Sequence, residues 1–153
     1  MTAPSRRAAR WIATTAVVAA VAFGGRQAYL FASALDGTLG APCDRAARFV
    51  RAAELPAGTH DRRCTTGQWM SISYELDFRA PREEAEAWLR ASYPDEPVRR
   101  GDCWNGSDAC AHPQPRPVPH TDENGDRQGD VLNVRIDYED GDVAHVRVSG
   151  VTI

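Results

Sequence analysis

The chain of 153 residues contains no lysine, so all 18 of its basic residues are arginine. We attribute this absence to the coding bias of a GC-rich genome, which indicates a bacterial protein and implies no special arginine chemistry. The sequence also lacks a G-x-S-x-G motif, a phosphate-binding loop and a C-x-x-C pair. These absences argue against serine hydrolase, nucleotide-binding and thiol-redox functions.

The first 34 residues contain no acidic residue. Arg6, Arg7 and Arg10 lie ahead of an uncharged run from Trp11 to Gly25. A basic patch followed by an apolar run directs the rest of a chain across a membrane, with the arginines staying inside. We therefore expect a cytoplasmic basic N-terminus at residues 1–10, a transmembrane anchor or signal peptide at residues 11–34, and an extracytoplasmic remainder.

The fate of this N-terminal segment has two interpretations. The uncharged run of 15 residues would span about 22 Å as a helix, which is shorter than the roughly 30 Å hydrocarbon core. That length favours a signal peptide, cleaved at Ala32-Ser33-Ala34, and a secreted protein. A helix continued to Ala32 would instead be long enough to cross, with Arg26 reaching the outer surface. The protein would then be held in the cell membrane through residues 11–32 as a single-pass protein.

The charge of the chain is divided between these two parts. Four arginines and no acidic residue precede Leu35, which leaves 14 arginines and 21 acidic residues for the exported part, a net charge of −7. An acidic domain repels phosphate backbones, so we expect no nucleic acid partner.

Four cysteines lie in the exported part. An even number of cysteines outside the cytoplasm is typical of disulfides, and four cysteines allow three pairings. We favour Cys43–Cys64 and Cys103–Cys110, because each pair encloses a local loop. Each disulfide would stabilise a domain of this size by roughly 2–4 kcal/mol.

We expect no metal and no cofactor. Cys103, Cys110, His112 and His120 match no standard zinc spacing, and exported thiols are usually oxidised. A second candidate, the segment from Asp122, begins like a calcium loop but has arginine where the turn needs glycine. It also has asparagine where a bidentate glutamate belongs.

The apolar pattern predicts an α+β domain over residues 43–153, preceded by an N-terminal hydrophobic helix and a tether at residues 35–42. We expect a small antiparallel sheet of three to four strands with two helices on one face. Residues 111–130 are rich in proline and charge and predict a disordered or extended loop. The expected helices are Asp44–Leu55 and Pro81–Ser92, and the expected strands are Met70–Arg79, Val131–Glu139 and Val143–Thr152, the last two joined by a turn at Asp140-Gly141.

The strand pattern also predicts that one face of the sheet is exposed to solvent; we call it the wet face. It would carry mixed charges, which are explained equally by a polar partner or by ordinary cross-strand pairs on a soluble surface. Trp69 falls on the polar side of its strand, a position more typical of a side chain packed under a neighbouring loop than of a partner contact. The residues expected on this face are Ser71, Ser73, Glu75, Asp77, Asn133, Arg135, Asp137, His145 and Arg147.

We interpret the chain as a membrane-anchored extracytoplasmic binding or accessory domain of a bacterial envelope protein, and we expect it to have no catalytic activity of its own. A protein partner in the envelope would contact the Cys103–Cys110 loop and the adjacent proline arm, because loops on a rigid scaffold carry recognition. The residues expected at this contact are Trp104, Asn105, Asp108 and Arg116. The alternatives are a secreted small inhibitor or hydrolase, released after cleavage near Ala34, and a structural accessory acting through its transmembrane helix.

Overall fold

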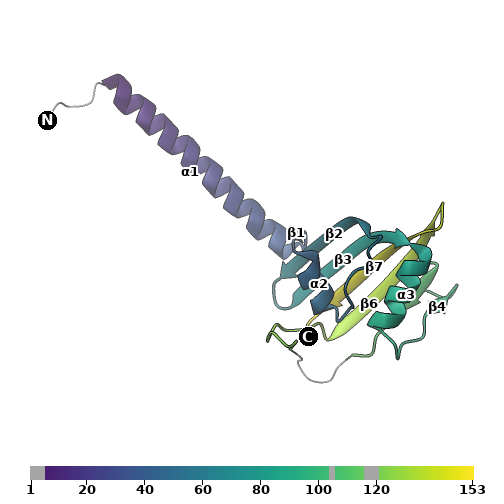
Figure 1. Cartoon of the computed structure of the whole chain (residues 1–153). Coiled ribbons are helices and arrows are strands. Elements are labelled where there is room, and N and C mark those ends of the chain that lie inside the picture. Colours follow the sequence, from purple (N-terminus) through teal and green to yellow (C-terminus); the bar gives the residue numbers. More distant parts are fainter. Residues whose placement is uncertain (1–5, 104–105, 116–120) are drawn as a thin grey trace.

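The computed structural model describes residues 6–103, 106–115 and 121–153, which form one N-terminal helix and an α+β domain (Figure 1). The strands make a single antiparallel sheet in the order β1-β2-β3-β7-β6-β5-β4. The elements are α1 (Arg6–Leu35), β1 (Leu39–Gly40), α2 (Cys43–Phe49), β2 (His60–Gln68), β3 (Ile72–Pro81), α3 (Arg82–Ser92), β4 (Arg99–Arg100), β5 (Ala109–Ala111), β6 (Val131–Glu139) and β7 (Val143–Val151).

The predicted α+β class and the antiparallel sheet agree with the structure, but the expectation of three to four strands is wrong. The described residues contain seven strands. Strand β2 was missed because its sequence, HDRRCTTGQ, is almost wholly polar and buries only Cys64 and Gly67. Strands β1, β4 and β5 have two or three residues each, which is too short to show an alternating pattern.

Helices α2 and α3 lie on the same side of the sheet and cover its apolar face (Figure 1). Leu76 and Phe78 of β3 and Val146 of β7 are fully buried beneath them. Trp88 of α3 meets Phe78 edge to face with 5.1 Å between ring centroids, and its indole N–H donates to the carbonyl of Ala53 at 3.1 Å. Burial of this single face is what the strict alternation along β3, β6 and β7 requires.

Helix α2 ends at Phe49, six residues before the predicted end at Leu55. Its chain reverses at Arg51, which has a positive φ of 59°. The N–H of Ala52 donates to the carbonyl of Ala47 at 2.9 Å, and the N–H of Arg51 donates to that of Arg48 at 3.0 Å. This Schellman ending usually uses glycine at the left-handed position, so an arginine there gives no sequence signal.

Helix α1 runs without a break through Gly24 and Gly25. Its segment from Thr14 to Leu35 is 22 residues long and apolar enough to cross a membrane by length and composition, and of its residues only Ser33, next to the domain, is buried. Figure 1 shows α1 extending away from the sheet, with only its C-terminal end close to the domain.

The segment expected as a tether, residues 35–42, joins α1 closely to the sheet. The helix ends in a second Schellman turn, in which Gly37 has a φ of 70° and the N–H of Thr38 donates to the carbonyl of Ser33 at 2.8 Å. Strand β1 then pairs with Thr65 and Thr66 of β2. The Cys43–Cys64 disulfide follows directly and joins the start of α2 to β2.

The described parts of the long loop contact the domain. Strand β5 is fully buried, and the second disulfide joins its Cys110 to Cys103. Thr121 and Arg127 form an isolated bridge, and the N–H of Gly129 donates to the carbonyl of Phe49 at 2.9 Å. The start and the end of the region therefore lie against the sheet edge and α2.

Candidate functional site

The face of the sheet opposite α2 and α3 carries rows of charged side chains. Residues that pair directly across antiparallel strands project on the same side. One row runs across the sheet through Arg63, Asp77, Arg147 and Arg135. The next row contains Arg79, His145 and Asp137. These side chains lie on the face that the sequence predicts to be wet.

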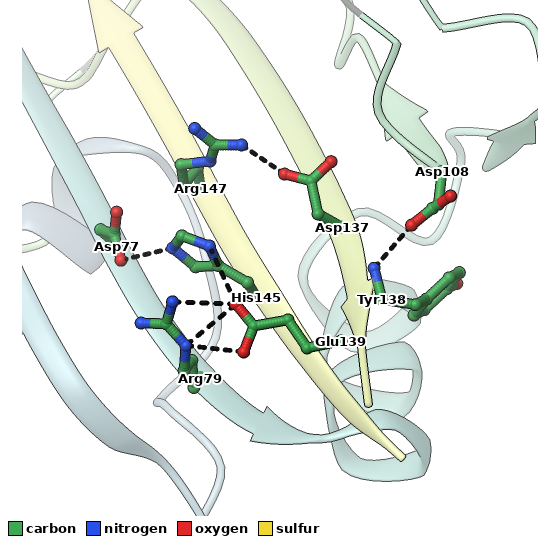
Figure 2. A network of polar contacts seen from close by, with 8 residues as sticks. All are labelled: Asp77, Arg79, Asp108, Asp137, Tyr138, Glu139, His145 and Arg147. Atoms are coloured by element: carbon green, nitrogen blue, oxygen red, sulfur yellow. Dashed lines mark hydrogen bonds and ion pairs between the residues drawn. The ribbon is translucent and has the colours of Figure 1, made fainter. Parts of the chain in front are cut away.

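Within these rows the charges pair diagonally between strands (Figure 2). His145 Nε2 lies 2.8 Å from Asp77 Oδ1, and Arg147 bonds to the carboxylate of Asp137. The guanidinium of Arg79 makes a forked contact with Glu139, with N···O distances of 2.8 to 3.1 Å. Forked arginine–carboxylate pairs fix geometry more strictly than single contacts. The open face therefore carries charged side chains in fixed positions. We call this set the charged grid; it contains Asp77, Arg79, Asp137, Glu139, His145 and Arg147.

The Arg79–Glu139 pair shifts the titration of both groups. The hydrogen bonds from Arg79 lower the pKa of the Glu139 carboxyl below its ordinary value of 4.5. The same contact raises the pKa of Arg79. Both groups are thus held in their charged forms, which suits a fixed electrostatic surface. A general acid would need the opposite shift, toward a pKa near neutral.

An open pocket of about 450 Å³ lies at the β2 side of this grid. A register shift in β2 between His60 and Arg63 forms a bulge, where Asp61 has a positive φ of 49°. Bulges bend a strand and redirect its side chains. Among the described residues, Arg62 and Arg63 make no ion pair, although both line the pocket. The lining residues are Asp61, Arg62, Arg63, Asp77, Arg79 and His145.

The predicted contact loop borders the same face. Its Cys110 pairs with Arg135 of β6, at the end of the first charged row. Asp108 is fixed by its carboxylate, whose Oδ2 accepts a hydrogen bond from the backbone N–H of Tyr138 at 2.7 Å (Figure 2). The other three predicted contact residues, Trp104, Asn105 and Arg116, lie outside the described residues.

Sequence reasoning identified the wet face but not the pocket. Arg62, Arg63 and Asp61 belong to the strand that the alternation did not reveal. The doublet Arg62-Arg63 directly before Cys64 was the available signal, since a disulfide cysteine must point inward and so orients its neighbours. The bulge between His60 and Arg63 interrupts the pairing register, and the residues there show no sequence pattern that predicts it.

A second polar cluster joins α3 to the sheet edge on the helix-covered side. Glu86 accepts hydrogen bonds from Tyr138 Oη at 3.1 Å and from Arg100 at 2.9 Å. Arg82 lies 3.8 Å from the centre of the Tyr138 ring. Burial by itself would raise the pKa of Glu86, but the Tyr138 hydrogen bond and the nearby guanidinium groups lower it overall. This cluster therefore connects α3 to the edge of the sheet, and these contacts occupy the Glu86 carboxylate.

No group of three or more histidine, cysteine, aspartate or glutamate residues is placed to hold a metal ion within the described ranges. In the segment that begins like a calcium loop, Asp122 Oδ1 accepts the N–H groups of Asn124 and Asp126, each at 2.9 Å. These bonds lower the pKa of Asp122 and close a local turn.

No protein-family profile, curated protein or solved structure matches this chain.

Proposed function

We propose that the protein is a membrane-anchored extracytoplasmic binding domain of the bacterial envelope, which recognises a protein partner and carries out no catalysis. The observation that supports this most directly is the open face of the sheet. Both packing helices lie on the other side, and the open face presents charged groups in fixed positions (Figure 2). Charge complementarity gives specificity and faster association to such a surface.

The binding surface in this proposal extends from the pocket at Arg62 and Arg63 across β3, β7 and β6 to the Cys103–Cys110 loop. The Asp77–His145, Asp137–Arg147 and Arg79–Glu139 pairs at its centre satisfy one another and need no partner. Two of the pocket arginines, Arg62 and Arg63, have no anionic partner among the described residues and lie at the rim. An acidic group on the partner would therefore bind there, and this arrangement fits rim charges that steer association.

The anchoring part of the proposal is supported by α1. The segment Thr14–Leu35 has the length and composition of a membrane span. The disulfides lie beyond it, in the part that the positive N-terminus would place outside.

The experiment is photo-crosslinking in the native cell, with a photoreactive residue at Arg63 of the full-length chain. The matched control places it at Arg90, whose side chain is 67 % exposed on α3, on the opposite side of the sheet. We expect one discrete product from position 63 in the membrane fraction and none from position 90. Equal products from both positions, or none from either, would contradict the binding surface. A chain shortened near Ala34 and found in the medium would support the secreted alternative instead.

A further inference from the structure

The hairpin between β2 and β3 exposes two adjacent apolar side chains, Trp69 and Met70, at 70 % and 92 %. Trp69 was expected to pack under a neighbouring loop, and the first strand was expected to begin at Met70; instead Trp69 is exposed and β3 begins at Ile72. Single exposed apolar residues are common on protein surfaces, but here a tryptophan and a methionine adjacent in the sequence are both exposed at one hairpin tip. Beyond α1, the other large apolar residues exposed in the described part are Val98 and Ile153.

This tip lies at the end of the sheet that α1 joins. A Cβ atom placed on Gly67 would lie 2.8 Å from the Cα of Gly37, so the backbone of β2 touches the turn that ends α1. Trp69 follows Gly67 by two residues, a distance of roughly 6–7 Å along a strand. The exposed pair is therefore close to the point where α1 meets the domain, and Figure 1 shows α1 meeting the sheet at β1 and β2.

The depth of this point in a membrane follows from the length of α1. The 22 residues from Thr14 to Leu35 extend about 33 Å, slightly more than the roughly 30 Å hydrocarbon core. Leu35 would then lie at the outer boundary of the core and Gly37 in the headgroup layer, which is about 5–7 Å thick on each side. Trp69, two residues along the chain from the contact of Gly67 with Gly37, would then lie at or next to the same layer.

The junction also keeps the hairpin in place. The Schellman turn at Gly37, the pairing of β1 with Thr65 and Thr66, and the Cys43–Cys64 disulfide join α1 to β2 within a few residues. A domain held in this way cannot swing its hairpin far from the membrane surface. Tryptophan is the side chain most typical of that surface, since its ring is apolar and its N–H remains wet.

We infer that Trp69 and Met70 insert into the headgroup layer of the leaflet into which α1 emerges, and so fix the orientation of the domain on the membrane. The inference rests on the proposed membrane anchor. With the hairpin on the lipid, the domain is held at two points, α1 and the β2–β3 tip, and the opposite end of the sheet, with the β6–β7 hairpin, points away from the bilayer. The acidic domain makes zwitterionic lipid the suitable surface.

The test uses the full-length chain in phosphatidylcholine vesicles, with bromine on the acyl chains as a fluorescence quencher. The emission of Trp69 is obtained as the difference between the wild-type chain and Trp69→Phe. We expect this difference emission to lie at shorter wavelength in vesicles than in urea-unfolded protein, to be quenched by brominated lipid, and to be shielded from aqueous acrylamide. Met70→Asp should shift it to longer wavelength, whereas the control Val98→Asp should leave it unchanged.

Two outcomes would overturn the inference, and they are distinguishable. If Trp11 in α1 is quenched by brominated lipid while the Trp69 difference emission is quenched only by acrylamide, the chain is anchored but the hairpin is in water. If no emission is quenched by lipid and the chain does not float with the vesicles, the membrane anchor itself fails, and with it the contact.

Discussion

The contact between Gly67 and Gly37 gives the sharpest stability prediction. A methyl group at position 67 would lie 2.8 Å from the Cα of Gly37 and 2.9 Å from Ser73 Oγ. Because the nearest atom is backbone, the turn that ends α1 has to move. Overpacking of this kind costs about 1–3 kcal/mol, so Gly67→Ala should destabilise the domain by about 2 kcal/mol.

Gly40→Ala is the matched control, since Gly40 lies in the adjacent strand β1 and has nothing within 4 Å of its added Cβ. That substitution should be neutral or stabilise by up to about 1 kcal/mol, through the entropy of the unfolded chain.

The assay is urea unfolding of the full-length chain in detergent micelles, followed by near-ultraviolet circular dichroism of the buried Trp88. With a slope of about 2 kcal/mol per molar urea, the midpoint for Gly67→Ala should fall by about 1 M. A wild-type midpoint for Gly67→Ala, or equal losses in both variants, would refute the close packing between α1 and β2.

Three further predictions concern the disulfides, the charged grid and the end of α2. Replacing Cys43 and Cys64 by serine should lower the free energy of unfolding by about 3.4 kcal/mol, because the disulfide closes a loop with a sequence separation of 21. Replacing Cys103 and Cys110, with a separation of 7, should lower it by about 2.5 kcal/mol. Equal decreases of the urea midpoint in the two variants would contradict this order. Because the pKa of Glu139 is lowered in the folded chain, its pair with Arg79 stabilises above pH 4.5 and is lost as the pH falls through the folded-state value. Arg79→Gln should therefore raise the pKa of Glu139 toward 4.5 in a carbon-13 NMR titration, and its destabilisation should be present at pH 7 and absent in strong acid. Tyr93→Phe removes a buried hydrogen bond of 2.8 Å to the carbonyl of Val50. In thermal unfolding it should lower the stability by about 1–3 kcal/mol. Unchanged stability would contradict this prediction and would mean that water replaces the hydroxyl at that carbonyl.

The elements with a clear period could be predicted from the sequence. Strand β6 has its predicted bounds, and β7 and α3 differ from theirs by one residue. The alternation of Leu132, Val134 and Ile136 is a local property, because it needs only one buried face. Asp140-Gly141 gave the turn for the same reason, since turn chemistry depends on adjacent residues.

The rest depended on contacts between distant segments. Strand β2 is held by its pairing with β3 and by the Cys43–Cys64 disulfide, so its polar sequence carries no pattern. The end of α2 and the chain reversal at Arg51 that follows it are fixed by hydrogen bonds, one of them from Tyr93, more than 40 residues away. The expected end at Leu55 lies directly before Pro56, a residue that cannot continue a helix, but the turn at Arg51 had already ended the helix.

The candidate site shows the same division. Alternation placed Asp77, Asp137, His145 and Arg147 on one face, but only the register between β3, β7 and β6 decides which charges pair. The pocket beside them needs the bulge at Asp61, a feature of paired strands that no single segment encodes. The partner contact of Asp108 stays a prediction; the hydrogen bond that its carboxylate accepts from the Tyr138 backbone N–H could not be predicted from the sequence.

The measurement that tests the central proposal most directly is the intact mass of the native protein from the membrane fraction and from the medium, before and after reduction. An anchored domain with two disulfides should appear in the membrane fraction at the full-length mass of 16.7 kDa. Reduction should add about four hydrogens, two for each disulfide. A mass beginning at Leu35 in the medium, or no gain on reduction, would contradict the account.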